Sequence, residues 1–179
     1  MKKIITLALF SFIALTSCSD GDPGPQGPPG EDGLIGSVVD VTGDFSAANN
    51  YELSLNFNDV GLEVYESDVV LVYLKTGEDG TAGGQPVEVF RQLPQTYYIN
   101  GQALQYNFDY TFFDVLIFLD GTADFGSLDS SYTDDQVLRV VVVPAEFAET
   151  SGVDISNMEA VMKALDVQEN DIEKASLKK

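Results

Sequence analysis

Hydrophobic positions in the middle of this 179-residue chain follow the two patterns that β-strands produce. Apolar and polar residues alternate strictly through residues 51–57 and 104–112, which is typical of strands with one buried face. Continuous apolar runs, which indicate strands covered on both faces, occupy residues 69–74, 115–119 and 137–143. Each of these segments predicts a β-strand.

Turn signals separate the predicted strands and set the fold class. Asn100-Gly101 is a strong hairpin signal because both turn positions need positive φ, and it joins residues 97–99 to the strand at 104–112. Further strands are expected from Val38 and at residues 87–90, with no helical pattern between them. The sequence therefore predicts an all-β fold, an antiparallel β-sandwich of Ig-like or jelly-roll topology.

Helical spacing of apolar residues is confined to the region near the C-terminus. Ser156 is the expected N-cap there, with Glu159 three residues later, and residues 173–179 are expected to fray. The residues at helical spacing predict one short helix packed on the sandwich: Met158, Val161, Met162 and Leu165.

Glycine occupies every third position from residue 21 to residue 36, and the first four triplets read Gly-Asp-Pro, Gly-Pro-Gln, Gly-Pro-Pro and Gly-Glu-Asp. This is a collagen-like pattern, since only glycine fits the axis of a triple helix. Two interpretations stay open. The run is an extended spacer reaching about 3.1 Å per residue, or it is a stalk that forms a homotrimer through residues 21–36.

The N-terminus predicts a lipid anchor. Lys2 and Lys3 precede an apolar stretch at residues 4–15, which is shorter than the about 20 residues that span a bilayer. It ends in Leu15-Thr16-Ser17-Cys18, a match to the bacterial lipobox. We expect cleavage before Cys18, a diacylglycerol on its thiol and acylation (for example by palmitate) of its new amino terminus, which together anchor the chain lastingly.

These patterns divide the chain into four expected segments. They are a signal peptide at 1–17, the lipidated cysteine with its Gly-x-y linker at 18–36, a β-sandwich domain at 37–149 and a helical extension at 150–179.

Charge narrows the choice of partners. The chain carries 29 acidic and 9 basic residues, a net charge of −20 that becomes −22 when cleavage removes Lys2 and Lys3. Such a surface repels nucleic acid and anionic headgroups. It suits a basic partner or divalent cations, or it only keeps an exposed protein dispersed.

Several catalytic chemistries are excluded by composition. The chain has no histidine, so a serine–histidine triad or histidine-ligated zinc cannot form, and its single cysteine is committed to lipid. The glycine-rich segment 77–84 lacks the lysine of a phosphate loop and is expected to be a mobile tip between two strands. The sequence therefore predicts neither an enzyme nor a resident cofactor.

Carboxylates crowd one segment between two apolar strands, where they are candidate calcium ligands because Ca²⁺ prefers hard oxygen atoms on loops. The alternative is that they are solvated turn residues. The candidates are Asp120, Asp124, Asp129, Asp134 and Asp135.

Three other residues have structural interpretations. Arg139 lies within a run of valines and is expected to be exposed or paired with an acid. Tyr106 and Tyr110 alternate with polar residues, so we expect them in the core or on the sheet face, not on a glycan-binding platform.

The combination of a lipobox, the triplets at residues 24–33 and a following β domain resembles flavobacterial collagen-like lipoproteins. Within the domain, residues 68–73, 93–98, 104–109 and 139–145 also resemble that group. Ser19-Asp20-Gly21-Asp22 resembles the signal that exports such lipoproteins to the cell surface. The resemblance implies an outer-membrane location and carries no functional residues.

The expected function is therefore that of a membrane-anchored, surface-exposed lipoprotein whose β-sandwich is a structural or interaction module for a protein or glycan partner. A periplasm-facing domain is the alternative orientation. The alternative function is a calcium- or glycan-binding accessory protein of an uptake or adhesion system.

Overall fold

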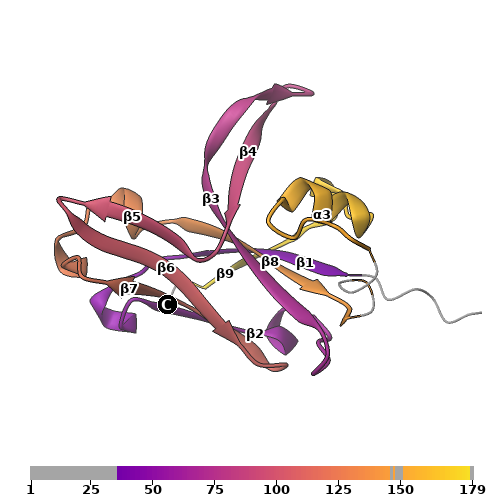
Figure 1. Ribbon diagram of the computed structural model, residues 1–179, viewed down its shortest axis with the longest axis horizontal. Coiled ribbons are helices and arrows are strands. Elements are labelled where there is room, and N and C mark those ends of the chain that lie inside the picture. The colour runs from indigo at the N-terminus through magenta and orange to yellow at the C-terminus, as the bar shows by residue number, and fades with distance from the viewer. Residues whose placement is uncertain (1–35, 146, 148–150, 178–179) are drawn as a thin grey trace, which may run out of the picture. The chain divides into compact units, whose positions relative to one another are not determined.

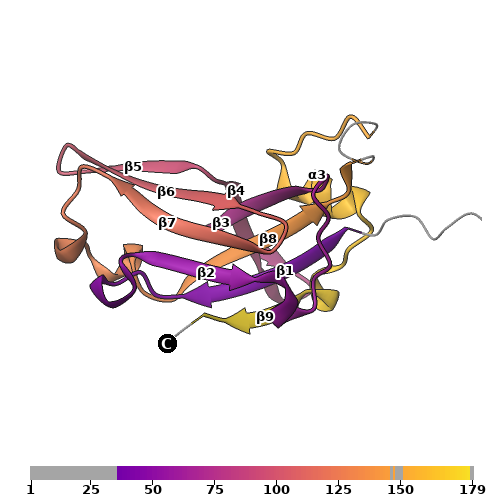
Figure 2. The same ribbon diagram turned by 90° about the horizontal axis from the view of Figure 1, so that it is seen from below.

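The computed structural model describes residues 36–145, 147 and 151–177, which form two β-sheets packed face to face with one short helix (Figures 1 and 2). This confirms the predicted all-β sandwich. The predictions for Cys18 and for the Gly-x-y run at residues 21–35 lie outside the described residues.

The larger sheet has the strand order β4-β3-β8-β1-β9, and the smaller sheet has the order β2-β7-β6-β5. Neighbouring strands are antiparallel except β1 and β9, which run parallel. The strands of the larger sheet are β1 (Ser37–Gly43), β3 (Val69–Ala82), β4 (Gln85–Gln92), β8 (Gln136–Val143) and β9 (Glu173–Ser176). Those of the smaller sheet are β2 (Glu52–Asn56), β5 (Gln95–Ile99), β6 (Gln102–Tyr110) and β7 (Asp114–Gly121).

Short helices lie in the connections. The α-helix is α3 (Met158–Ala164), and the 3-10 turns are η1 (Ala47–Asn49), η2 (Phe57–Val60), η3 (Phe125–Ser127), η4 (Ser130–Tyr132) and η5 (Glu169–Asp171). Asn157, not the expected Ser156, is the N-cap of α3, because its Oδ1 accepts the backbone N–H of Ala160 at 3.1 Å. In the described part of the chain, none of the helices has the length and apolar character needed to span a membrane.

The inner core lies between the sheets and follows the period of two that alternation predicts. Val39 and Val41 of β1 point into it, as do Val70, Val72 and Leu74 of β3. From the smaller sheet it takes Leu53 and Leu55 of β2, Leu104 and Tyr106 of β6, and Val115, Ile117 and Leu119 of β7.

A second core covers the other face of the larger sheet, which explains the continuous apolar runs of β3 and β8. Leu71 and Tyr73 of β3, with Val141 and Val143 of β8, point to this outer side. The covering side chains come from the C-terminal segment: Val161, Met162, Leu165 and Ile172. The run in β7 differs, because Leu116 and Phe118 lie on the solvent face of the smaller sheet and are only half-buried.

The expectation that residues 173–179 fray is wrong for the part that the structure describes. Residues 173–176 form β9 and pair with β1 from Val39 to Thr42. The backbone N–H of Leu177 then donates to the carbonyl oxygen of Thr42 at 2.8 Å. The C-terminal segment is thus an edge strand of the sandwich as well as its cover.

Two hairpins show how glycine sets the turns. Asn100 and Gly101 have φ values of 52° and 82°, which confirms the predicted tight turn between β5 and β6. In the other hairpin, β3 and β4 continue as a ribbon that projects beyond the sandwich (Figure 1). Segment 77–84, expected to be a mobile tip between two strands, does connect β3 and β4, but residues 77–82 belong to β3 and the turn is confined to Gly83 and Gly84.

Candidate functional site

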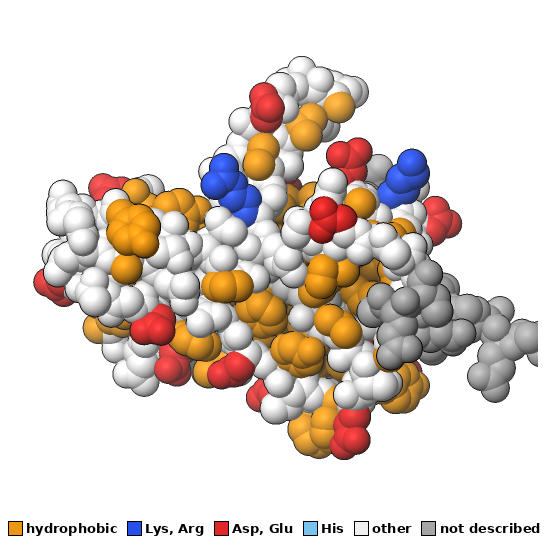
Figure 3. Space-filling model, in the orientation of Figure 1, with side chains coloured by type: hydrophobic (Ala, Val, Ile, Leu, Met, Phe, Trp, Pro, Cys, Tyr) orange, Lys and Arg blue, Asp and Glu red, His pale blue; other side chains and the backbone are white. Residues whose placement is uncertain are grey.

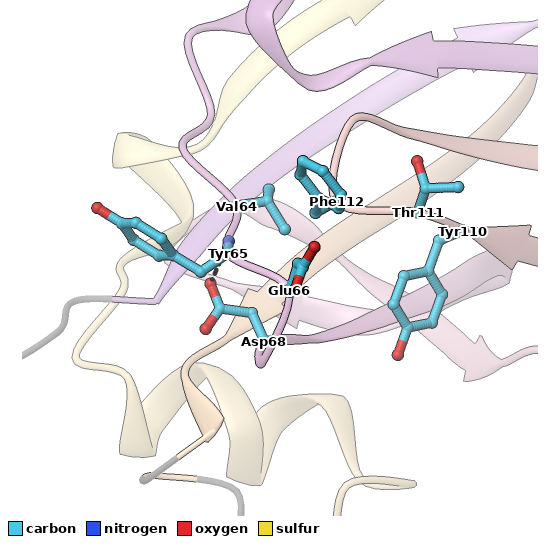
Figure 4. Close-up of a pocket in the computed structure, with 7 residues that line it drawn as sticks. All are labelled: Val64, Tyr65, Glu66, Asp68, Tyr110, Thr111 and Phe112. Atoms are coloured by element: carbon cyan, nitrogen blue, oxygen red, sulfur yellow. Dashed lines mark hydrogen bonds between the residues drawn. The ribbon is translucent and has the colours of Figure 1, made fainter.

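A cleft of about 380 Å³ opens at one end of the sandwich, between the segment before β3 and the turn after β6 (Figure 4). We call it the aromatic cleft. Its lining residues are Val64, Tyr65, Glu66, Asp68, Tyr110, Thr111 and Phe112.

The strand register places this cleft at the end where β1 begins. Ser37, the first residue of β1, and Val70, near the start of β3, both pair with Val142 of β8. Tyr65 and Asp68 immediately precede β3. The cleft therefore lies at the same end as the point where the chain enters the sandwich from its N-terminal part.

The β6–β7 turn holds two phenylalanines outside the core. The Thr111 hydroxyl donates to Asp114 Oδ1 at 2.6 Å and accepts the backbone N–H of Phe113 at 3.0 Å, which fixes the turn. Phe112 is 38% exposed and Phe113 is 56% exposed, with their ring centroids 3.9 Å apart. A rigid turn thus presents apolar surface to solvent.

The opposite wall combines a tyrosine with carboxylates. The Tyr65 hydroxyl donates to Glu63 Oε1 at 2.7 Å, and this hydrogen bond raises the pKa of Tyr65. The backbone N–H of Tyr65 donates to Asp68 Oδ2 at 3.0 Å. In the view of Figure 4, Tyr65 and Tyr110 lie on opposite sides of Glu66 and Asp68.

Exposed apolar side chains and acids are thus concentrated at this end. Tyr65 is 53% exposed and Tyr110 is 43% exposed, beside the two exposed phenylalanines. Figure 3 shows hydrophobic side chains with acidic ones beside them over the end of the molecule where β3 begins and β6 ends. On that face the lysine and arginine side chains lie near the base of the β3–β4 ribbon and over α3.

Sequence reasoning missed most of this site. Tyr106 is buried in the core, one of the two expected positions, and Tyr110, at the end of the same strand, is 43% exposed and lines the cleft, a role that was not expected. One usable signal was the pair Phe112-Phe113 just before the strand at 115–119, because a connection between two strands usually runs over the protein surface. No sequence signal indicated that residues 64–68 line the cleft, since this depends on contact between the segment before β3 and the turn after β6.

The predicted calcium ligands are not brought together. Asp124 and Asp129 cap η3 and η4 by accepting the backbone N–H groups of Gly126 and Ser131 at 3.2 and 2.9 Å. Asp120 accepts the N–H of Gly121, and Asp134 accepts the hydroxyl of Thr133. The backbone N–H of Asp135 donates to Asp44 Oδ1 at 2.7 Å.

These contacts are those of turn residues. The hydroxyl and backbone N–H of Ser131 lower the pKa of Asp129, as expected for a carboxylate that caps a turn. Within the described residues, no three acidic or other metal-ligating side chains are grouped so that they could hold a metal ion. The arrangement favours the alternative interpretation of the five aspartates as solvated turn residues.

Arg139 is fully buried, so the expectation of exposure is wrong and that of pairing with an acid is confirmed. Its Nε and Nη2 donate to the two oxygens of Asp40 at 2.8 and 3.0 Å, and Nη1 and Nη2 donate to Glu169 at 2.6 and 2.8 Å. Nη1 also contacts Sδ of Met158 at 3.2 Å, and the guanidinium carbon lies 4.3 Å from the centre of the Phe90 ring.

The Arg139 cluster is structural in character. Burial alone lowers the pKa of Arg139, but its hydrogen bonds to Asp40 and Glu169 outweigh this and raise the pKa above its ordinary value. All five N–H groups of the guanidinium are used, and the cluster joins β1, β8, β4 and the C-terminal segment. The sequence signal was the pair of lone opposite charges, Asp40 and Arg139, in two valine-rich strands.

A second groove, of about 660 Å³, is lined by residues of β2, β7 and the end of β9. Its lining mixes polar edge residues such as Glu52, Ser54 and Asn56 with Leu116 and Leu177. It lacks the exposed rings that mark the aromatic cleft.

Comparisons of the chain with models of known protein families, with curated proteins and with solved structures find no match. The case for a function therefore depends on the residues and on the geometry described above.

Proposed function

We propose that this protein is a lipid-anchored interaction module: Cys18 attaches it to the outer membrane, the Gly-x-y segment spaces the domain from the membrane, and the β-sandwich binds a partner at the cell surface without catalysis. The observation that carries the binding role is the aromatic cleft. Exposed aromatic side chains grouped around a concave site mark interaction surfaces more often than scattered ones do.

The anchoring role is supported by the sequence alone. Leu15-Thr16-Ser17-Cys18 follows a charged and apolar leader, and the next triplets supply a linker. A linker of this composition is extended and reaches about 3.1 Å per residue, so it would keep the cleft clear of the headgroups.

Metabolic labelling with radioactive palmitate in a bacterium that processes lipoproteins tests the anchor. We expect label on the wild-type chain and none on Cys18→Ser, with only the wild type in the membrane fraction. The matched control is Ser19→Ala, which keeps Cys18 and should remain labelled. A Cys18→Ser chain that stays acylated would contradict the anchor.

Orientation has a separate test. Protease added to intact cells should remove the domain of a surface-displayed protein, while a periplasmic reporter stays whole. Persistent protection of the domain, with digestion after the outer membrane is opened, would place the domain on the periplasmic side instead.

A glycan-binding accessory role is the second candidate, favoured by the exposed rings of Tyr65 and Tyr110. Tyrosine rings can stack on sugar faces while the neighbouring carboxylates accept hydroxyl hydrogen bonds. A glycan array with wild type and Tyr110→Ala would test it, and binding that does not change in the variant would exclude this cleft.

A further inference from the structure

The charge of the aromatic cleft limits what it can bind. Two of its lining side chains are carboxylates, Glu66 and Asp68, and no lysine or arginine among the described residues lines it. Glu66 forms no hydrogen bond or ion pair with any described residue, and Glu63 adds a third acid beside Tyr65. Nothing within the described part of the chain neutralises this charge.

Its aromatic rings favour the same kind of ligand. The face of a phenyl or phenol ring attracts a cation within about 6 Å, most strongly where water is excluded. Tyr110 and Phe112 offer partly exposed rings next to the carboxylates. A positively charged group could therefore contact carboxylate and ring together.

The Arg139 cluster has the same combination of carboxylates and an aromatic ring, with a cation already bound to them. There a guanidinium takes two carboxylates, Asp40 and Glu169, and lies against the ring of Phe90. The aromatic cleft has two carboxylates and several rings, and none of the described residues that line it is a lysine or arginine. The volume of about 380 Å³ is near the lower end of the range for ligand pockets, about 300–1,000 Å³, and suits one long side chain with its adjoining backbone.

Other occupants fit the cleft less well. A second copy of this chain would bring the same acids against Glu66 and Asp68, from a molecule with a net charge of −20. An anionic membrane surface is repelled for the same reason. Phe112 in the lining and its neighbour Phe113 in the turn are also exposed, so a ligand with apolar residues next to its cation would cover them as well.

We propose that the aromatic cleft binds a lysine or arginine side chain of an extended segment in a partner protein, with the adjoining apolar residues of that segment on Phe112 and Phe113. This inference rests on the proposed role as an interaction module and names the chemistry of its partner.

Fluorescence anisotropy with labelled peptides tests the inference on the full-length lipoprotein in non-ionic detergent. One peptide carries an arginine between two phenylalanines, and the other carries citrulline, which has nearly the same shape without the charge. We expect the arginine peptide to bind about tenfold more tightly than the citrulline peptide, and added salt to reduce the difference.

Variants assign the binding to the cleft. Glu66→Gln and Tyr110→Ala should each lower the affinity for the arginine peptide about three- to tenfold and leave the far-ultraviolet circular dichroism unchanged. The matched controls are Asp79→Asn, an exposed acid on the projecting ribbon, and Tyr98→Ala, whose side chain is 79% exposed on the smaller sheet. Both should bind like the wild type.

Equal binding of the two peptides, or no binding of either at millimolar concentration, would overturn the inference. So would a Tyr110→Ala effect confined to vesicle binding, glycan binding or self-association. Because acylation of Cys18 and protease access are measured separately, failure of the peptide test would leave the proposed anchoring intact.

Discussion

At the scale of single residues, the ion pairs of Arg139 show how burial changes the energetic importance of a charged partner. Its partner Asp40 lies directly opposite in the register of β1 and β8, and the Asp40 side chain is 7% exposed. Glu169, the other partner, has a side chain that is 64% exposed. Both carboxylates contact the same guanidinium, but only the carboxylate of Asp40 is buried away from solvent.

This asymmetry predicts unequal costs for removing the two carboxylates. We expect Asp40→Asn to lower the free energy of unfolding by about 3 kcal/mol, because it leaves a buried cation short of a partner. Glu169→Gln should cost about 1 kcal/mol or less, since water can replace an exposed carboxylate. Urea denaturation followed by circular dichroism measures both.

Asp79→Asn, on the exposed ribbon, is the control for removing a negative charge and should leave stability unchanged. Equal losses for Asp40→Asn and Glu169→Gln would show that the burial of Asp40 does not govern the energy of the cluster.

At the scale of elements, the C-terminal segment contributes a cover for the larger sheet and an edge strand as well as its short helix. Its side chains cover the outer core, and Glu169 reaches Arg139. The Tyr73 hydroxyl donates to the carbonyl oxygen of Ile155, and β9 completes the edge beside β1. We infer that the larger sheet depends on this segment to keep its second face out of water.

Truncation after Leu165 tests this dependence. Loss of Ile172, Glu169 and β9 should expose the outer face of the larger sheet, lower the urea midpoint and increase the fluorescence of the dye ANS, which binds exposed apolar surface. The control removes only Lys178 and Lys179. A truncated chain with the same midpoint and dye binding as the control would contradict the covering role.

At the scale of the whole molecule, each core contains a tyrosine whose pKa is raised by burial: Tyr106 between the sheets and Tyr73 on the outer side. A raised pKa in the folded state means that the neutral form is favoured there. The stability that this supplies is present below the ordinary tyrosine pKa of 10.0 and is lost as pH rises beyond it.

We therefore expect the free energy of unfolding to fall above pH 10, by up to about 1.4 kcal/mol per pH unit for each of the two buried tyrosines. Tyr106→Phe and Tyr73→Phe should each flatten this decline, and Tyr98→Phe, at an exposed position, should not. Urea unfolding between pH 8 and pH 11 gives the slopes, and identical slopes in all four proteins would contradict the assignment.

The local sequence pattern was enough to predict most strands of the sandwich but few residues of the candidate site. Alternation at residues 51–57 and 104–112 predicted β2 and β6 because a half-buried strand must alternate. Residues 173–176 have no such pattern, and they form a strand only because β1 offers them an open edge. Tyr65 and Tyr110 share a cleft because two loops meet at one end of the sandwich.

The sequence by itself determined the β class, the Asn100-Gly101 turn and the absence of histidine chemistry, since each depends on near neighbours or on composition. The lipid anchor and the spacer also come from sequence alone, as predictions. Only the tertiary structure decided that Arg139 is buried between Asp40 and Glu169, that no three of the five candidate aspartates form a group that could hold a metal ion, and that rings and carboxylates form one cleft. The physical reason is that burial and charge pairing depend on which distant segments come into contact, and hydrophobic periodicity along the chain does not predict those contacts.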